Sequence, residues 1–126
     1  MNTKTKRYIA ISLTTIVSLI MTAGAFAKVL KVQAVVDSFT KIGVGEYTQI
    51  LGLFELVFIA LYLIPRTMKI GFLLLCSYLG GAIATHLSHH EDFFQPVIPL
   101  ALIWVTAFLR DGSLFYSKQG KFVNEP

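Results

Sequence analysis

The chain has 126 residues, of which 55% are hydrophobic and 14% are charged, and its formal net charge is +4. Soluble domains carry about 25% charged residues, so this composition excludes an ordinary soluble domain and, at this length, favours one integral membrane domain. No basic groove with interleaved aromatic residues is visible, which excludes a nucleic-acid-binding protein.

Four apolar runs dominate the sequence, at residues 8–27, 47–64, 70–87 and 93–109. They are about 17 to 20 residues long, and a helix needs roughly 17–25 residues to cross the hydrocarbon core of a bilayer. The fourth run is the shortest, and Pro96 and Pro99 lie in its first two turns, where a helix tolerates the loss of N–H donors. We therefore predict a single membrane domain over residues 1–126, an all-α four-helix bundle in which each run is a span.

Basic residues between the runs predict the orientation of the chain. With the N-terminus in the cytoplasm, eight of the 11 lysines and arginines lie on the inner side, and only Lys28, Lys31 and Lys41 lie on the outer side. Cytoplasmic loops of membrane proteins carry this excess of basic residues. The sequence therefore predicts a multi-pass protein of the bacterial inner membrane with both termini in the cytoplasm.

The first run has features of a span and of a signal peptide. Lys4, Lys6 and Arg7 precede it, and it closes with Ala25-Phe26-Ala27, which resembles a cleavage site after Ala27. However, the run is longer than the apolar core of a signal peptide, which has about 7–15 residues. We expect an uncleaved first span.

Small residues in two of the runs predict a helix-packing seam. In the first run Thr14, Ser18 and Thr22 recur every four residues and form one stripe on a helix, and in the third run Gly80 and Gly81 are adjacent. Such residues allow membrane helices to approach closely and to form hydrogen bonds across the interface. A polar lining for a ligand is the alternative interpretation.

The segment between the first two runs predicts a short amphipathic helix on the outer membrane face. Its apolar residues recur at intervals of three or four, at Val29, Val32, Val35 or Val36, Phe39 and Ile42. This spacing is typical of a helix with one apolar face, and Gly43 and Gly45 then end it. The functional alternative is a lid over the outer end of the bundle.

A tight turn, Pro65-Arg66-Thr67, follows the second run and makes the second and third spans antiparallel neighbours. Folding the chain about this turn places Glu55 level with Gly80 and His86 level with Gln49. At about 1.5 Å of rise per residue, Glu55 and His86 differ in depth by about 10 Å, so no direct contact is expected. We predict that they belong to one polar track, whose intervening members are Gln49, Gly80, Gly81 and Thr85.

Glu55 is the only acidic residue within an apolar run. A carboxyl group inside a span is costly, usually faces the bundle interior and often marks a proton or ligand path. Because burial disfavours its charged form, we expect a neutral Glu55 that donates a hydrogen bond to a quinone-like ligand or relays a proton. The structural alternative is a hydrogen bond to a hydroxyl group of the first span, such as that of Thr22.

All three histidines of the chain lie at the end of the third run or just after it, at His86, His89 and His90. On a continuing helix this spacing places them on one side, where they form a candidate transition-metal site. The order His-Leu-Ser-His-His-Glu is not the His-Glu-x-x-His arrangement of a metalloprotease. We therefore assign no metal, and His86 alone remains a candidate for proton exchange with a ligand.

Two further features limit the chemistry. Cys76 is the only cysteine, and a membrane thiol oxidase needs a pair. Nothing in the sequence predicts an enzyme that acts on its own.

The segment after the fourth run is expected at the inner membrane face. Arg110-Asp111-Gly112 marks the inner boundary of the span, and an interfacial tail follows with Leu114, Phe115, Tyr116, Lys118 and Lys121.

Several of these motifs, in this order, resemble the DoxX-like family of small four-span bacterial membrane proteins. The resemblance extends from about Ile9 to Leu109. It rests on Ala23-Gly24 to Lys28, the amphipathic segment that ends near Gly43, Ile50-Leu-Gly-Leu-Phe-Glu55-Leu, Leu63-Ile-Pro65-Arg66, and Gly81-Ala-Ile-Ala-Thr-His86.

The resemblance implies a link to membrane redox systems. Members of the wider DoxX/DoxD group include a subunit of a thiosulfate:quinone oxidoreductase and a membrane partner in thiol-stress complexes, and many members have no assigned activity. It also implies that Glu55 and His86 occupy polar positions of the family in spans two and three. The His89-His90 pair has no counterpart in that pattern.

Three hypotheses of function follow. The first is an accessory subunit of a quinone-linked membrane redox system, with a membrane or soluble oxidoreductase subunit as partner and a quinone near Glu55, His86 and Gln49. The second is a structural module that binds another membrane protein through the stripe of Thr14, Ser18 and Thr22. The third is a small proton-coupled carrier with Glu55 as the proton site, for which four spans without a repeat favour a homo-oligomer.

Overall fold

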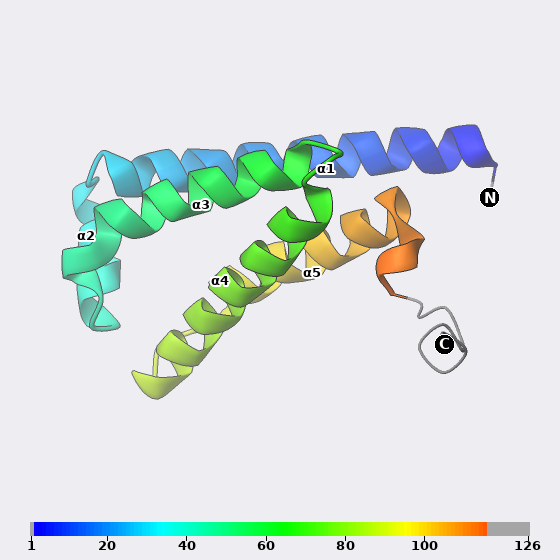
Figure 1. Ribbon diagram of the computed structural model, residues 1–126. Coiled ribbons are helices and arrows are strands. Elements are labelled where there is room, and N and C mark those ends of the chain that lie inside the picture. The colour runs from blue at the N-terminus through cyan, green and yellow to red at the C-terminus, as the bar shows by residue number, and fades with distance from the viewer. Residues whose placement is uncertain (1, 116–126) are drawn as a thin grey trace, which may run out of the picture.

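The structure is a computed structural model that describes residues 2–115, and all its regular elements are helices (Figure 1). In chain order they are the α-helices and 3-10 helices (η) α1 (Thr3–Val29), α2 (Gln33–Lys41), η1 (Gly45–Tyr47), α3 (Thr48–Leu63), α4 (Met68–Ser88), α5 (Phe94–Arg110) and η2 (Gly112–Leu114). The predicted all-α class is therefore confirmed.

Among residues 2–115, three helical stretches are long and apolar enough to cross a membrane: α1, η1 with α3, and α4. The apolar helix α5 is shorter, with 17 residues, which is about the lower limit for a span. Large apolar side chains point outward from the bundle, and Ile16, Leu19 and Leu73 are each more than half exposed. A surface of this kind needs lipid around it, so the chain is a helical membrane protein.

The four long helices form two antiparallel pairs (Figure 1). In one pair α1 packs along α3, in the other α4 packs along α5, and the pairs touch each other through α3 with α4 and through α1 with α5. Figure 1 shows the pairs meeting at the end that carries the α3–α4 turn, here called the narrow end, and diverging toward the opposite, wide end, where α2 lies. The predicted neighbourhood of the second and third spans is present.

Close backbone packing joins the pairs at the narrow end. A Cβ atom on Gly71 of α4 would lie 2.2 Å from the backbone nitrogen of Tyr62 of α3, so only glycine allows this approach. The hydroxyl group of Tyr62 in turn donates to the carbonyl oxygen of Ile103 of α5, at 3.2 Å. The apolar core extends from there and contains Val17, Met21, Ile59, Tyr62, Met68, Phe72, Leu75, Leu79, Ile103 and Ala107.

The predicted amphipathic helix is α2, although it begins at Gln33 rather than near Val29. The chain first ends α1 and turns, and Lys31 adopts a left-handed conformation with φ 54° in this turn. Gly43 follows α2 with φ 82°, a conformation that glycine adopts without strain. The turn allows α2 to contact both α1 and α3.

The beginning of the predicted interfacial tail packs on the bundle. Phe115, just after η2, lies with its ring 5.8 Å from that of Phe72 and 5.2 Å from that of Trp104, measured between centroids. The rest of that tail, with Tyr116, Lys118 and Lys121, lies outside the described residues.

Candidate functional site

Glu55 lies in the middle of α3 with only 4% of its surface exposed. Lys28 of α1 forms an ion pair with its carboxylate, and the hydroxyl group of Tyr78 of α4 donates to the same oxygen atom, Oε2, at 3.2 Å. Sequence reasoning did not anticipate this arrangement, in which Glu55 has a cationic partner and a hydroxyl donor within the protein. The predicted alternative partner was wrong: the hydroxyl group comes from Tyr78 rather than from Thr22.

Lys28, near the end of α1, turns its side chain into the bundle. We expected the first span to end before it, but α1 continues to Val29, and only 15% of the side chain of Lys28 is exposed. Its ammonium group lies 5.6 Å from the ring centroid of Phe39 of α2 and 5.5 Å from that of Tyr78. The cation is therefore held by one carboxylate and two aromatic faces, both of which attract it.

Gly52 explains how Lys28 reaches Glu55. It precedes Glu55 by three residues and so lies on the same face of α3. A Cβ atom there would lie 2.7 Å from Cβ of Lys28 and 2.8 Å from the carbonyl oxygen of Ala25. Because Gly52 has no side chain, α1 and α3 lie close enough together for Lys28 to reach Glu55.

A cavity of about 540 Å³ lies beside this ion pair. All four long helices and α2 contribute to its wall, which is mostly apolar. Its polar groups are Lys28, Ser38, Glu55, Tyr78, His86 and Gln95. A largely apolar cavity of this size with a few converging polar groups is typical of a small-molecule site.

The helix α2 forms one side of the cavity. Ala34, Val35, Ser38 and Phe39 line it, and the ring of Phe39 also faces Lys28. The helix α2 is therefore part of the cavity wall, and the lid hypothesis stays a prediction.

Glu55 and His86 line the same cavity without a hydrogen bond between them. The register expected from the α3–α4 turn is close to the one observed, since Glu55 bonds to Tyr78, two residues before Gly80. Nδ1 of His86 lies 2.7 Å from the carbonyl oxygen of Ala82. A carbonyl oxygen only accepts, so Nδ1 carries a hydrogen, and Nε2 of a neutral His86 is an acceptor.

The other residues predicted for the polar track and for the helix-packing seam do not line this cavity. Gln49 is exposed and donates to the carbonyl oxygen of Val29 at 3.3 Å. Gly80 and Gly81 are exposed, and a Cβ atom on either would meet nothing within 4 Å. Within the seam Thr14 and Ser18 are buried and Thr22 is half-buried, so the first two residues are covered by the chain itself.

The three histidines are separated because α4 ends among them. Its last helical residue is Ser88, and His90 has a left-handed φ of 57°. The amide groups of His90 and Glu91 donate back to the carbonyl oxygens of Leu87 and His86, at 3.2 and 2.9 Å, which is a Schellman motif. No group of three potential metal ligands occurs within residues 2–115.

His89 takes a third position, at the turn before α3. Its ring packs against Gly43, where a Cβ atom would lie 2.9 Å from its Nε2. The three histidines do not share one helix face, because α4 ends before His89.

Sequence reasoning missed Lys28, Tyr78 and Gln95 as members of the site. A signal was present for Lys28, because it directly follows an apolar run and a buried carboxylate needs a cationic partner. Tyr78 and Gln95 carried no such signal, since their positions depend on how α4 and α5 diverge from α1 and α3.

One of three comparisons with known proteins identifies the family of this chain. The family model of the DoxX-like family matches residues 12–109, which is most of the chain. A search among curated proteins and a search among solved structures each found no match. The matched region includes Lys28, Glu55, Tyr78 and His86, and the chain belongs to the DoxX-like family.

Proposed function

We propose that this protein is an accessory subunit of a quinone-linked membrane redox system and that it binds the quinone head group in the cavity beside Glu55. The observation that carries the proposal is the combination in one cavity of an ion pair, Lys28 with Glu55, and a second titratable group, His86. Most of the remaining wall is apolar, which suits a ligand dissolved in the bilayer.

The chemistry of a quinone matches these groups. Each carbonyl oxygen of a quinone accepts hydrogen bonds, and the ammonium group of Lys28 and the amide group of Gln95 are donors in the wall. The hydroxyl groups of a reduced quinone donate instead, and Nε2 of a neutral His86 accepts. The cavity therefore offers partners for both forms of the ligand.

The membrane placement is part of the proposal. Four spans, with α5 as the short fourth one, place the wide end and α2 at the outer face and both termini in the cytoplasm of a bacterial cell. The basic residues near the narrow end, Lys6, Arg7, Arg66, Lys69 and Arg110, support this orientation.

Narrowing the cavity is expected to weaken quinone binding. Gly24 lines the cavity and a Cβ atom on it meets nothing within 4 Å, so Gly24→Leu adds a side chain to the cavity wall at a position where the backbone leaves room. The affinity of the purified protein for decylubiquinone, measured by isothermal titration calorimetry in detergent, should fall by at least about tenfold, which is ~1.4 kcal/mol.

Gly80→Leu is the matched control, because Gly80 is an exposed glycine outside the cavity wall. It should leave the affinity unchanged. Equal affinity of the Gly24→Leu variant and the unchanged protein would show that the quinone does not occupy this cavity.

Changes at the two titratable positions test the redox role in membranes. Glu55→Gln removes the negative charge that holds Lys28, and His86→Ala removes the acceptor at the other side of the cavity. Each is expected to lower quinone-dependent oxygen consumption by inverted membrane vesicles by several-fold, compared at equal protein levels on immunoblots. Unchanged rates at normal protein levels would contradict the redox role.

A further inference from the structure

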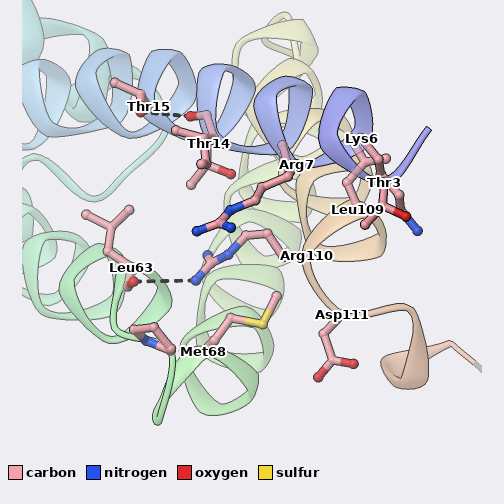
Figure 2. A pocket seen from close by; sticks show the side chains of 13 residues that line it. Thr3, Lys6, Arg7, Thr14, Thr15, Leu63, Met68, Leu109, Arg110 and Asp111 are labelled. Carbon is pink, nitrogen blue, oxygen red and sulfur yellow. Dashed lines mark hydrogen bonds between the residues drawn. The ribbon is translucent and has the colours of Figure 1, made fainter. Parts of the chain in front are cut away.

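A second pocket, of about 730 Å³, lies at the narrow end of the bundle (Figure 2). The first turns of α1, the α3–α4 turn and the end of α5 enclose it, and Lys6, Arg7 and Arg110 supply three cationic side chains. It contains none of the residues of the cavity beside Glu55. Nothing in the proposed quinone site accounts for it.

The two arginines differ in what holds them. Arg110 donates to the carbonyl oxygens of Tyr62 at 2.7 Å and of Leu63 at 3.4 Å, so its guanidinium group is fixed at the end of α3. Arg7 makes no hydrogen bond or ion pair within residues 2–115. Figure 2 shows both guanidinium groups pointing into the same space between α1 and the α3–α4 turn. Two like charges in one pocket repel each other unless an anion lies between them.

The one carboxylate of the pocket does not neutralise them. Asp111 accepts hydrogen bonds from the amide and hydroxyl groups of Ser113, and Lys69 lies 3.9 Å away. The hydroxyl group of Ser113 is the main cause that lowers the pKa of Asp111 below its ordinary value. In Figure 2 its carboxylate points away from the guanidinium groups, so their positive charge remains available in the pocket.

A buried hydroxyl group without a partner faces the same pocket. Thr14 is 8% exposed, and its Oγ1 has no hydrogen bond among the described residues. Its neighbour Thr15 satisfies its own hydroxyl group by donating to the carbonyl oxygen of Ile11 at 2.8 Å. In Figure 2 the Thr14 side chain points from α1 toward the pocket, on the same side as Arg7. Buried polar groups almost always have a partner, so this hydroxyl group indicates a ligand.

We propose that this pocket binds the phosphate group of an anionic phospholipid. Guanidinium groups form paired, charge-assisted hydrogen bonds with phosphate oxygens, and basic pockets at the cytoplasmic ends of membrane helices suit anionic lipid head groups. A lipid rather than a free anion is favoured by the apolar part of the wall, which includes Ile11, Leu63 and Leu109. Ile11 is 53% exposed on the outside of the bundle, so the pocket adjoins the surface that lipid tails cover.

The test compares an anionic with a zwitterionic lipid on the purified full-length chain. Dimyristoyl-phosphatidylglycerol and dimyristoyl-phosphatidylcholine are titrated separately in detergent, and bound lipid is counted by native mass spectrometry. The anionic lipid should bind at least about tenfold more tightly, as expected for a charge-assisted contact. Equal binding of the two lipids would overturn the proposal.

Substitutions locate the site. Arg7→Gln and Thr14→Val should each weaken binding of phosphatidylglycerol, by about tenfold for Arg7→Gln. Arg7→Lys keeps the charge but loses the paired donors, so its affinity should lie between that of the unchanged protein and that of Arg7→Gln. Lys41→Gln removes a charge at the end of α2 and should change nothing. Unaltered affinity in both Arg7→Gln and Thr14→Val, with normal elution as a folded protein, would also overturn the proposal.

Competition with inorganic phosphate distinguishes a lipid phosphate group from a free phosphate ion as the ligand of this pocket. At millimolar concentration inorganic phosphate should compete only weakly with phosphatidylglycerol, because it lacks the tails that the apolar wall contacts. If inorganic phosphate displaces the lipid completely and raises the Tm of the protein as much as the lipid does, the pocket is a soluble-anion site and the lipid assignment is wrong.

Discussion

Lys28→Met is expected to lower the free energy of unfolding by about 3 kcal/mol, the lower end of the range measured when one partner of a buried ion pair is removed. The substitution keeps the length of the side chain but leaves the carboxylate of Glu55, which is 4% exposed, without its cation. The hydroxyl group of Tyr78 remains as a donor but carries no charge. Unfolding by sodium dodecyl sulfate in mixed micelles measures the change.

A double-mutant cycle separates the ion pair from other effects of the substitutions. Glu55→Gln alone should also destabilise, because it leaves the ammonium group of Lys28 without a carboxylate. The variant with both changes should lose less than the sum of the two single losses, by about 1–3 kcal/mol. Simple addition of the two losses would contradict the pairing. Lys31→Met, an exposed lysine on the same side, is the control and should stay within ~0.5 kcal/mol.

Gly71→Ala is expected to destabilise the protein by about 3 kcal/mol or more, at or beyond the upper end of typical overpacking costs. Its Cβ atom would lie 2.2 Å from the nitrogen and 2.5 Å from the Cα atom of Tyr62. These are backbone atoms, which cannot move aside as a flexible side chain does. The α3–α4 crossing must therefore open, and the hydrogen bonds of Tyr62 to α5 must stretch with it.

Gly80→Ala on the same helix is the control for helix propensity. A Cβ atom there meets nothing within 4 Å, so the free energy of unfolding should stay the same or rise by ~0.5–1 kcal/mol, the usual gain of alanine over glycine in a helix. Both variants are compared by the same unfolding assay and by elution on size exclusion. Similar stability of the two alanine variants would contradict the close crossing at Gly71.

The helices of this fold could be predicted from the sequence because hydropathy alone reports them. The apolar runs at 47–64 and 70–87 differ from α3 and α4 by one or two residues at each end. The turn at Pro65 also determined the register, so that Glu55 was expected near the level at which Tyr78 is found. Both inferences use local spacing, which does not depend on how the helices are packed.

The composition of the site could not be predicted to the same extent, because it depends on contacts between distant segments. Lys28 was counted only as one of the charges that flank a span, whereas the close approach of α1 to α3 at Gly52 places its side chain beside Glu55. The three histidines fit one helix face only if α4 continues, and the left-handed His90 shows that it stops. Neither the close approach of α1 to α3 nor the end of α4 can be predicted from hydropathy or from residue spacing.

The contact between Lys28 and Phe39 has a consequence for how this protein communicates with its surroundings. The ammonium group touches α2 through Phe39 and α3 through Glu55, so the position of α2 and the state of the cavity are thermodynamically linked. A ligand that draws Lys28 toward itself weakens its hold on α2. By reciprocity, a protein that binds α2 and displaces Phe39 alters the affinity of the cavity by the same factor. A protein bound at α2 would therefore respond to an occupant of the cavity that it never contacts.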